Sequence, residues 1–378
     1  MTEIHTSTAD FTFLVRNLAN QDDRFSAAFD ILEKAIAVRA FPACALAVTL
    51  AGELIAHKAL GRFTYDSAPP DATTSNLFDL ASLTKVVATT TMAMILYERG
   101  LLDLEAPVTA VVPEFADPSD HDDERRQVTL RLLLAHSSGL AAYEKLFLRA
   151  PTRETLLRAA FSTPLTAAPA TRTEYSDIGF IILGVALERL ADEPLDVFCQ
   201  REIFGPLGMT RTTFNPAPAF KSSVVPTADD RVFRHRLIQG EVQDENASIL
   251  GGVAPHAGLF STAEDLAIFS HNMLNDGYPI LRPGTLNLFT RRQPVPVDTS
   301  RALGWDTPSS PSQSGKYFSP RSFGHLGYTG TSLWIDPERQ LSISLLTNRT
   351  WPDCQNQAIK QVRPAVHDAV VEALESQV

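Results

Sequence analysis

The apolar residues near the start of the chain predict a helix followed by a β-hairpin. Over Asp23–Arg39, four apolar side chains recur at helical spacing and would line one face: Phe25, Phe29, Leu32 and Ile36. Two apolar runs follow, Cys44–Leu50 and Glu53–Leu60, and the Ala51-Gly52 pair between them is typical of a hairpin turn. This part of the chain therefore contributes one helix and two strands.

The middle of the chain is predicted to be mostly helical. Ser82–Arg99 begins this series, and Gly100 is a typical residue just after a helix. Four further helices are predicted: Thr129–His136, Arg153–Phe161, Asp177–Leu190 and Pro194–Ile203. Ser261-Thr262-Ala263-Glu264 has the Ser-x-x-Glu form of a capping box and predicts the start of another helix.

Strand character returns towards the end of the chain. Thr331–Ile335 and Leu341–Thr347 are predicted strands around a turn, and a last helix covers Pro364–Leu374. Strands at both ends with helices between them favour one antiparallel sheet built from both termini. The expected fold class is α/β, in finer terms α+β: an antiparallel sheet flanked by helices, with an all-helical domain inserted. We expect residues 1–98 plus 251–378 to form the sheet domain and 99–250 the insertion, with a site in the cleft between them.

Composition and charge exclude several classes of protein. Hydrophobic residues make up 44% of the chain and charged residues 20%, which excludes a disordered, collagen-like or coiled-coil chain. The 33 Lys and Arg against 44 Asp and Glu give a net charge of −11, so no nucleic-acid partner is expected. No apolar run approaches the roughly 18 residues that a membrane span needs. The first residues, Met-Thr-Glu-Ile-His, show no signal peptide, so a cytoplasmic location is expected, with a periplasmic or secreted one still open if a leader has been removed.

Neither the cysteines nor the histidines indicate a metal site. Cys44, Cys199 and Cys354 are far apart and form no Cys-x-x-Cys pair, so three inert thiols are expected. The nine histidines show no paired metal-ligand spacing. The motifs His-Glu-x-x-His, Gly-x-x-x-x-Gly-Lys and Gly-x-Ser-x-Gly are absent, so neither a zinc protease, a P-loop protein nor an α/β-hydrolase is expected.

Ser82-Leu83-Thr84-Lys85 is a Ser-x-x-Lys motif at the start of a predicted helix. Residues three apart share one helical face, so the Ser82 hydroxyl and the Lys85 amine can meet. A serine hydroxyl is a weak nucleophile until a neighbour accepts its proton, and a buried lysine can do so if its pKa is lowered. In a chain of this size such a motif arises by chance about as often as not, so it needs support from others.

Two further motifs supply that support. Tyr175, in Glu174-Tyr175-Ser176-Asp177, lies just before a predicted helix, where it could act as a general base towards Ser82 and later as the acid towards the leaving group. The segment 324–330, Gly-His-Leu-Gly-Tyr-Thr-Gly, precedes a predicted strand, and its glycines would let a ligand approach the backbone. Alone, these motifs also fit an ordinary loop tyrosine and a tight turn that feeds an edge strand.

In chain order, Ser82-x-x-Lys85, Tyr175-x-Asp177 and His325-x-Gly327 resemble the three motifs of the serine β-lactamase and penicillin-binding protein superfamily, in particular its class C β-lactamase-like branch. Four other segments are similar to landmarks of that branch: 78–81, 133–140, 206–209 and 324–336. The resemblance covers most of the chain and implies a β-lactamase/transpeptidase-like fold.

The resemblance implies acyl transfer in two steps. Ser82 would attack a carbonyl and form an acyl-enzyme, Lys85 and Tyr175 would move the proton, and water would release the acyl group. The backbone N–H groups of Ser82 and Tyr328 would form the oxyanion hole. This chemistry needs no metal and no organic cofactor.

Two positions depart from the lactamase pattern. Asp177 stands where asparagine is usual; a carboxylate cannot donate a hydrogen bond to a substrate, and its charge would tend to keep Lys85 protonated, which shifts the base role towards Tyr175. His325 stands where lysine is usual and is largely neutral at pH 7 unless a partner such as Asp177 raises its pKa. Asp177, His325 and Gly327 are expected to bind substrate, in a site that resembles esterase and peptidase-like members and lacks an obvious fixed cation.

Segments 225–227, 240–247 and 251–261 resemble a subgroup of penicillin-binding-protein-like hydrolases and enzymes encoded near, or fused to, cell-wall aminosugar hydrolases. Gln243 and Pro255 stand where histidine and glycine are usual there. We expect a loop in the cleft wall, with His256 and Asp244 as candidate substrate contacts. The alternative for His256 is a structural hydrogen bond that holds the glycine-rich loop.

Three functions are therefore considered. The leading hypothesis is a serine hydrolase that works through an acyl-serine on small esters or on cell-wall-derived peptides or amides, like an esterase or D,D-peptidase. The second is a β-lactamase, and the third is a non-catalytic scaffold protein that keeps the fold. The complete set of Ser82, Lys85 and Tyr175 argues against the third. The expected partner is a small-molecule ester, a β-lactam or a peptidoglycan-derived substrate.

Overall fold

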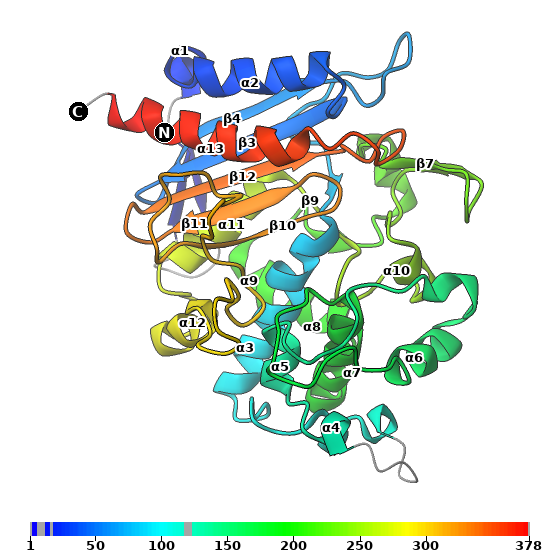
Figure 1. Ribbon diagram of the computed structural model, residues 1–378. Helices are drawn as coiled ribbons and strands as arrows, with labels where there is room; N and C mark the ends of the chain where they lie inside the picture. The colour runs from blue at the N-terminus through cyan, green and yellow to red at the C-terminus, as the bar shows by residue number, and fades with distance from the viewer. Residues whose placement is uncertain (1, 6–11, 16–17, 117–122, 377–378) are drawn as a thin grey trace.

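A seven-stranded sheet forms the upper half of the molecule in Figure 1. The computed structural model describes residues 2–5, 12–15, 18–116 and 123–376. The strands stand in this order across the sheet: β1 (Thr2–His5), β2 (Thr12–Val15), β4 (Glu53–Gly61), β3 (Ala43–Leu50), β12 (Leu341–Thr347), β11 (Ser332–Asp336) and β10 (Phe323–Leu326). Neighbouring strands are antiparallel except β2 and β4. The pairing of β3 with β12 joins the two ends of the chain and confirms the predicted sheet.

Helices cover both faces of this sheet. On one face α2 (Ser26–Ala37) packs beside α13 (Ile359–Glu375), and from the other face α11 (Ala263–Leu274) contacts β3, β11 and β12 (Figure 1). Alternation along β3 explains the two faces, because Leu46 and Val48 pack with α2 and α13 whereas Ala45 and Ala47 face the core that contains α11. The sheet is therefore a middle layer between two helical layers.

The other helices lie on the α11 side of the sheet (Figure 1). They are α3 (Thr91–Glu98), α4 (Asp123–Arg126), α5 (Leu130–Leu134), α6 (Arg153–Phe161), α7 (Asp177–Ala191), α8 (Leu195–Cys199), α9 (Gly205–Leu207), α10 (Glu245–Ile249) and α12 (Pro283–Thr290), with α1 (Gln21–Arg24) beside α2. Residues 178–187 of α7 are all buried, so this helix is the core of the helical part rather than a surface helix. The expected mixed fold is confirmed, and the domain limits at 98, 99, 250 and 251 stay a prediction.

Short strands complete the molecule between these parts. One group pairs β5 (Phe78–Asp79) with β9 (Leu259–Ser261) and β9 with β6 (Thr213–Phe214). A separate hairpin pairs β7 (Ala228–Asp230) with β8 (Arg236–Ile238). The first group places the end of β5, just before Ser82, directly beside the segment that leads from the glycine-rich loop into α11.

Several predicted elements differ from the structure. The helix expected over Ser82–Arg99 is a 3-10 turn at Ala81–Leu83, a π-helix over Lys85–Thr90, and then α3. The Thr91 hydroxyl donates to the Val86 carbonyl five residues earlier, which supports the wider π turn. The helix expected over Asp23–Arg39 is divided into α1 and α2.

Three other boundaries also differ. His325, expected in a glycine-rich turn, lies within edge strand β10. The cap of α11 is Thr262, whose side chain accepts from the Asp265 N–H, because Ser261 belongs to β9. The last helix begins at Ile359, five residues before the expected start at Pro364, and the Ala358 N–H just before it donates to Asn356 Oδ1.

In the part of the chain that the structure describes, no helix is both long and apolar enough to cross a bilayer. Cys44 and Cys199 are buried and Cys354 is partly exposed, and all three are free thiols. Burial raises the pKa of the Cys44 thiol to about 12, so this sulfur is a packing group rather than a nucleophile.

Candidate active site

Ser82 follows β5 in a turn that is held from both sides. Ala81, just before it, has a φ of +47°, a left-handed conformation that residues other than glycine rarely adopt. Asp79 Oδ1 accepts a hydrogen bond of 2.8 Å from the Ala81 N–H. From the other side, Thr331 donates to the Leu80 carbonyl at 3.0 Å. These contacts fix the backbone that presents the Ser82 hydroxyl.

The Lys85 ammonium is fully buried and meets three oxygens. Its Nζ donates to Ser82 Oγ at 3.0 Å and to the His256 carbonyl at 3.0 Å, and lies 2.6 Å from Asp177 Oδ1. Two of its three N–H donors therefore have hydrogen-bond acceptors, and the Asp177 carboxylate contributes an ion pair. Burial lowers the pKa of Lys85, but the Asp177 carboxylate and Tyr175 raise it more, and the net shift is upward. Lys85 is therefore charged at neutral pH, as expected from Asp177.

Tyr175 lies against two cations. Lys85 Nζ is 4.8 Å and Arg301 Cζ 5.3 Å from the centroid of its ring, and the His325 ring centroid is 5.7 Å away. Within the described residues its buried hydroxyl makes no hydrogen bond of good geometry, although Lys85 and Ser82 are near enough to lower its pKa. Burial outweighs them and the net pKa of Tyr175 is raised, so the side chain is a neutral phenol whose hydroxyl is free to meet a ligand.

His136 positions Tyr175 and was not expected to belong to the site. Its ring packs against Tyr175, with centroids 4.6 Å apart, and against Phe180 at 4.9 Å. Its Nδ1 accepts a hydrogen bond of 3.0 Å from the Ser176 N–H, and burial holds its pKa well below the usual range, so it is neutral. The Ser176 side chain in turn caps α7. His136 lies in the segment 133–140 that resembles a family landmark, but the sequence alone gave it no role.

His325 is a neutral histidine in β10. Its Nδ1 lies 2.8 Å from the Leu326 carbonyl, to which it donates, and its buried Nε2 has no partner in the described part of the chain. Burial, followed by the charges of Arg301 and Lys85, holds the pKa of His325 well below its usual value. The alternative that Asp177 raises this pKa is wrong, because that carboxylate pairs with Lys85.

The turn after β10 packs against the Ser82 turn. A Cβ on Gly327 would overlap Thr331 Oγ1 and lie 2.5 Å from the Leu80 carbonyl oxygen, so glycine is needed for close backbone packing. Tyr328 is half-exposed, and its carbonyl accepts from Arg349 Nε at 2.7 Å. Across the described residues, the Tyr328 backbone N–H makes no hydrogen bond, which leaves it available as the oxyanion donor expected with Ser82.

The buried His256 side chain pairs with Asp244, whose side chain is 19% exposed. His256 Nε2 lies 3.0 Å from Asp244 Oδ1, which also accepts from the Ala247 N–H at 2.7 Å and so caps α10. Burial tends to raise the pKa of Asp244, but His256, the Ala247 N–H and Lys85 together lower it more. The His256 side chain is 1% exposed and its carbonyl accepts from Lys85. These contacts favour the structural alternative for His256 over a direct substrate contact.

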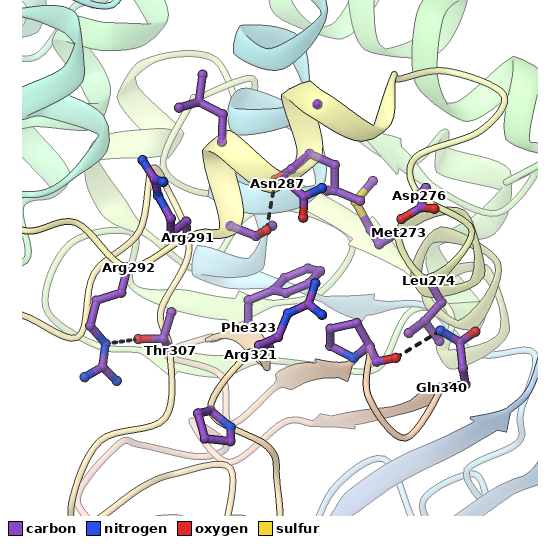
Figure 2. Close-up of a pocket in the computed structure, with 16 residues that line it drawn as sticks. Met273, Leu274, Asp276, Asn287, Arg291, Arg292, Thr307, Arg321, Phe323 and Gln340 are labelled. Atoms are coloured by element: carbon purple, nitrogen blue, oxygen red, sulfur yellow. Dashed lines mark hydrogen bonds between the residues drawn. The ribbon is translucent and has the colours of Figure 1, made fainter.

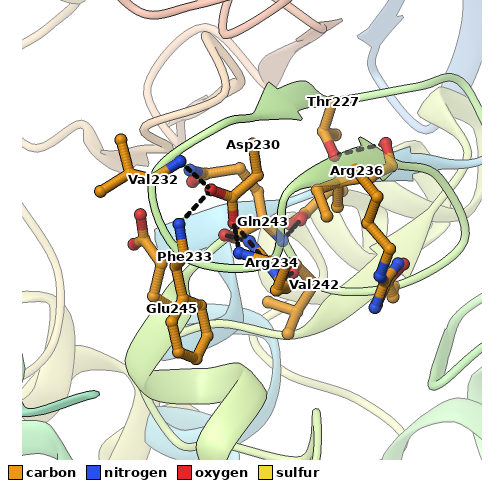
Figure 3. A network of polar contacts seen from close by, with 12 residues as sticks. Thr227, Asp230, Val232, Phe233, Arg234, Arg236, Val242, Gln243 and Glu245 are labelled. Carbon is orange, nitrogen blue, oxygen red and sulfur yellow. Dashed lines mark hydrogen bonds and ion pairs between the residues drawn. The ribbon is translucent and has the colours of Figure 1, made fainter. Parts of the chain in front are cut away.

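A buried ion pair in the β7–β8 hairpin ties this hairpin to the cleft-wall loop that contains Gln243. Asp230 and Arg234 pair at 2.8 Å with both side chains 7% exposed, and Asp230 also accepts from the backbone N–H groups of Val232 and Phe233 (Figure 3). Arg234 donates to the Gln243 carbonyl at 2.5 Å, and the Gln243 N–H donates to Asp79 at 2.7 Å. Burial raises the pKa of Asp79 to about 6. The loop is thus tied to the carboxylate that fixes the Ser82 turn.

A groove of about 710 Å³ lies away from these residues. Figure 2 shows it between α12 and the turn that joins β11 to β12, with Arg292 bonded to Thr307 on its wall. Arg291 and Arg321 also line it, and none of the expected catalytic residues does. In the described ranges, no group of three or more His, Cys, Asp or Glu side chains is arranged to hold a metal ion.

The comparisons with known proteins identify the family. The model of the family described as Beta-lactamase matches residues 29–366. An N-acetylmuramyl-L-alanine amidase of Bacillus subtilis (strain 168) is 33% identical over 84% of this chain and 79% of its own length. A putative D-alanyl-D-alanine carboxypeptidase of Escherichia coli (strain K12) is 32% identical over 82% of this chain and 79% of its own. The structure of EstCE1, a hydrolase with promiscuous acyltransferase activity, has a TM-score of 0.76 at 20% identity over 93% of this chain and 100% of that one.

The chain therefore belongs to the Beta-lactamase family, within the superfamily of serine β-lactamases and penicillin-binding proteins. This confirms the family resemblance, the expected fold and the expected class of enzyme, a serine hydrolase. The roles of individual site residues stay predictions.

We predict that Gly327→Ala impairs acylation of Ser82 with a modest loss of stability. The added methyl group would push the β10–β11 turn away from Leu80, and such overpacking typically costs about 1–3 kcal/mol. Urea unfolding and the rate of acyl-adduct formation by mass spectrometry would measure both effects. Gly284→Ala, at a position with open space around its Cβ, is the matched control. Normal acylation in Gly327→Ala would contradict the close packing.

We predict that Asp177→Asn lowers the pKa of Lys85 and keeps acylation. Without the carboxylate, burial would dominate, and a neutral Lys85 can accept the Ser82 proton directly. In the wild type Lys85 stays protonated below about pH 9 both folded and unfolded, so it adds no slope to stability there. In the variant the folded pKa would lie below the unfolded one, so the free energy of unfolding should fall as pH drops from about 9 to 6.

Urea unfolding at several pH values would test this slope, with acyl-adduct formation measured in parallel. Asp276→Asn, an exposed change of the same kind, is the control. A variant with the wild-type slope and no acylation would show that Asp177 does not set the charge of Lys85.

We predict that Asp230→Ala destabilises the protein or its cleft-wall loop by about 3–5 kcal/mol, because it leaves the buried Arg234 without its counter-ion. Glu241→Ala is the matched control, since Glu241 pairs with Arg236 on the exposed side of the same hairpin and should cost less than about 1 kcal/mol. Chemical unfolding and hydrogen exchange across 227–247 would compare them. Equal effects would show that burial of the Asp230 pair contributes nothing.

Proposed function

We propose that Ser82 is the acylated nucleophile of a hydrolase that acts on peptidoglycan-derived amides or peptides. The observation that carries this is the 3.0 Å contact between Lys85 Nζ and Ser82 Oγ beneath the ring of Tyr175. The names of the relatives at 33% and 32% identity refer to a muramyl-L-alanine bond and a D-alanyl-D-alanine bond, which supports this substrate class. The site would lie between the sheet part and the proposed insertion, 99–250.

In this proposal Tyr175 relays the proton and Lys85 provides charge. Because Lys85 is already an ammonium, it cannot take the Ser82 proton, and because Tyr175 is a neutral phenol it is a weak base alone. As Ser82 Oγ bonds to the carbonyl carbon, its proton would pass to the Tyr175 oxygen while the Tyr175 proton passes to the departing atom. No free phenolate then forms, and Lys85 stabilises the partial negative charge on both oxygens.

The second step would run the same path in reverse. Water attacks the acyl carbon, its proton passes through Tyr175, and Ser82 Oγ leaves with a proton as the carboxylic acid is released. The carbonyl oxygen would lie between the backbone N–H groups of Ser82 and Tyr328 in both steps. Asp177 would act through Lys85 rather than on the substrate.

β-Lactam hydrolysis is the second candidate, favoured by the family match alone. Asp177 is committed to Lys85 and, as a carboxylate, cannot donate a hydrogen bond to a β-lactam as an asparagine amide can. We therefore propose slow acylation by β-lactams rather than efficient turnover.

A panel of substrates tests the proposal. The protein would be incubated with a muramyl-L-alanine peptide, a D-alanyl-D-alanine peptide, a chromogenic short-chain ester, a chromogenic cephalosporin and a fluorescent penicillin. We expect turnover of at least one of the first three, reduced roughly 10³-fold or more in Ser82→Ala. Ser162→Ala, an exposed serine at the end of α6, is the control. Turnover that persists in Ser82→Ala would refute the role of Ser82, and fast cephalosporin turnover would favour the second candidate.

A further inference from the structure

Arg301 brings a cation to the cleft that the sequence did not indicate. It lies in the loop between α12 and β10, and its guanidinium stacks against the ring of Tyr175, with Cζ 5.3 Å from the centroid. Its side chain is 19% exposed, so it reaches solvent beside the ring. The backbone is held, since the Arg301 N–H donates to Thr299 and its carbonyl accepts from the Gln293 N–H.

Apart from its stacking on Tyr175, the Arg301 guanidinium is only loosely paired in the described residues. Its ion pair with Asp306 is long, 3.8 Å from Nη1 to Oδ2, which is beyond hydrogen-bond distance. Asp306 Oδ1 is occupied by the Ser300 hydroxyl at 2.7 Å and the Thr307 N–H at 3.0 Å. Within the described residues the Arg301 guanidinium donates no hydrogen bond, so its fork of N–H groups is open to a ligand.

The other cations around the site are committed to the fold. Lys85 donates two hydrogen bonds and is paired with the Asp177 carboxylate, and His325 is neutral. Arg349 donates to the Tyr328 carbonyl, and Arg363 donates to the carbonyls of Gly327 and Gly330. These two arginines stabilise the turn after β10 by donating hydrogen bonds to its backbone carbonyls. In the described cleft, Arg301 is therefore the cation suited to bind an anionic group of a substrate.

We propose that Arg301 binds a carboxylate on the leaving group of the substrate, and so selects bonds to an amino acid or a hydroxy acid. This inference rests on the proposed function, in which the Tyr175 hydroxyl protonates the departing atom. A carboxylate one or two bonds from that atom would lie near the ring of Tyr175, where the guanidinium is. A guanidinium can grip both oxygens of a carboxylate, which a neutral imidazole such as His325 cannot do.

Two thioesters that share an acyl group test this proposal: benzoylglycyl-thioglycolate, with a carboxylate on its leaving thiol, and its methyl ester. We expect Arg301→Ala to lower kcat/KM for the carboxylate substrate roughly 10- to 100-fold and to change that for the methyl ester less than about 3-fold. Arg301→Lys should keep part of the preference, because the charge stays and the fork is lost. Arg321→Ala, an equal change of charge in the exposed groove of Figure 2, should leave both rates unchanged.

Equal losses on both thioesters in Arg301→Ala would overturn the proposal, because they would mean that Arg301 only supports Tyr175. Absence of Ser82-dependent thiol release in the wild type would reject the proposed function instead. Calorimetric binding of the two thioesters to Ser82→Ala, with and without Arg301→Ala, decides the Arg301 inference in either case. A preference for the carboxylate that is lost with Arg301 supports it, and equal binding of both thioesters refutes it.

Discussion

The buried ammonium of Lys85 is the constraint on which the rest of the site depends. Removing such a charge from water costs several kcal/mol unless acceptors replace the solvent. Here the acceptors come from three separate parts of the chain: the Ser82 hydroxyl one turn away, the Asp177 carboxylate at the start of α7, and the His256 carbonyl in the glycine-rich loop. The contacts of this one ammonium therefore fix Ser82, α7 and the glycine-rich loop relative to one another.

The unusual backbone around Ser82 follows from this arrangement. Ala81 holds a left-handed conformation, Lys85–Thr90 is a π-helix, and Gly327 approaches the Leu80 carbonyl more closely than any side chain would allow. Each feature is unfavourable by itself and persists because the surrounding structure over-determines it. Strands β11 and β12 and residues 178–187 of α7, all of which are buried, provide the rigid frame that keeps these features in place.

The same distinction explains how far the sequence alone could predict the molecule. The apolar patterns of β3, β12, α6 and α7 reflect burial, so their limits could be predicted to within a residue or two. The π turn after Ser82 and the strand character of His325 depend on tertiary partners and leave no local pattern. The effect of Asp177 on Lys85 could be expected from the resemblance of the motifs to those of the family, in which asparagine is usual at this position. Arg301 could not, because only the fold brings it beside Tyr175, 126 positions earlier in the chain.

The charges around the cleft are distributed unevenly, with acidic side chains on one side and a positive charge on the other. On the cleft-wall side, Asp244 and Glu245 begin α10, and the Tyr143 hydroxyl lies 3.4 Å from Glu245. On the side of Tyr175 the open charge is that of Arg301. His325 is neutral and adds no charge. The opposite charges of Lys85 and Asp177 cancel each other at the centre of the cleft. If the proposed roles hold, a substrate with one anionic end would be oriented by repulsion from the first side and attraction to the second, with its scissile carbonyl over Ser82. The overall charge of −11 would then hinder anionic substrates in general, whereas the position of Arg301 admits those that carry their charge on the leaving group.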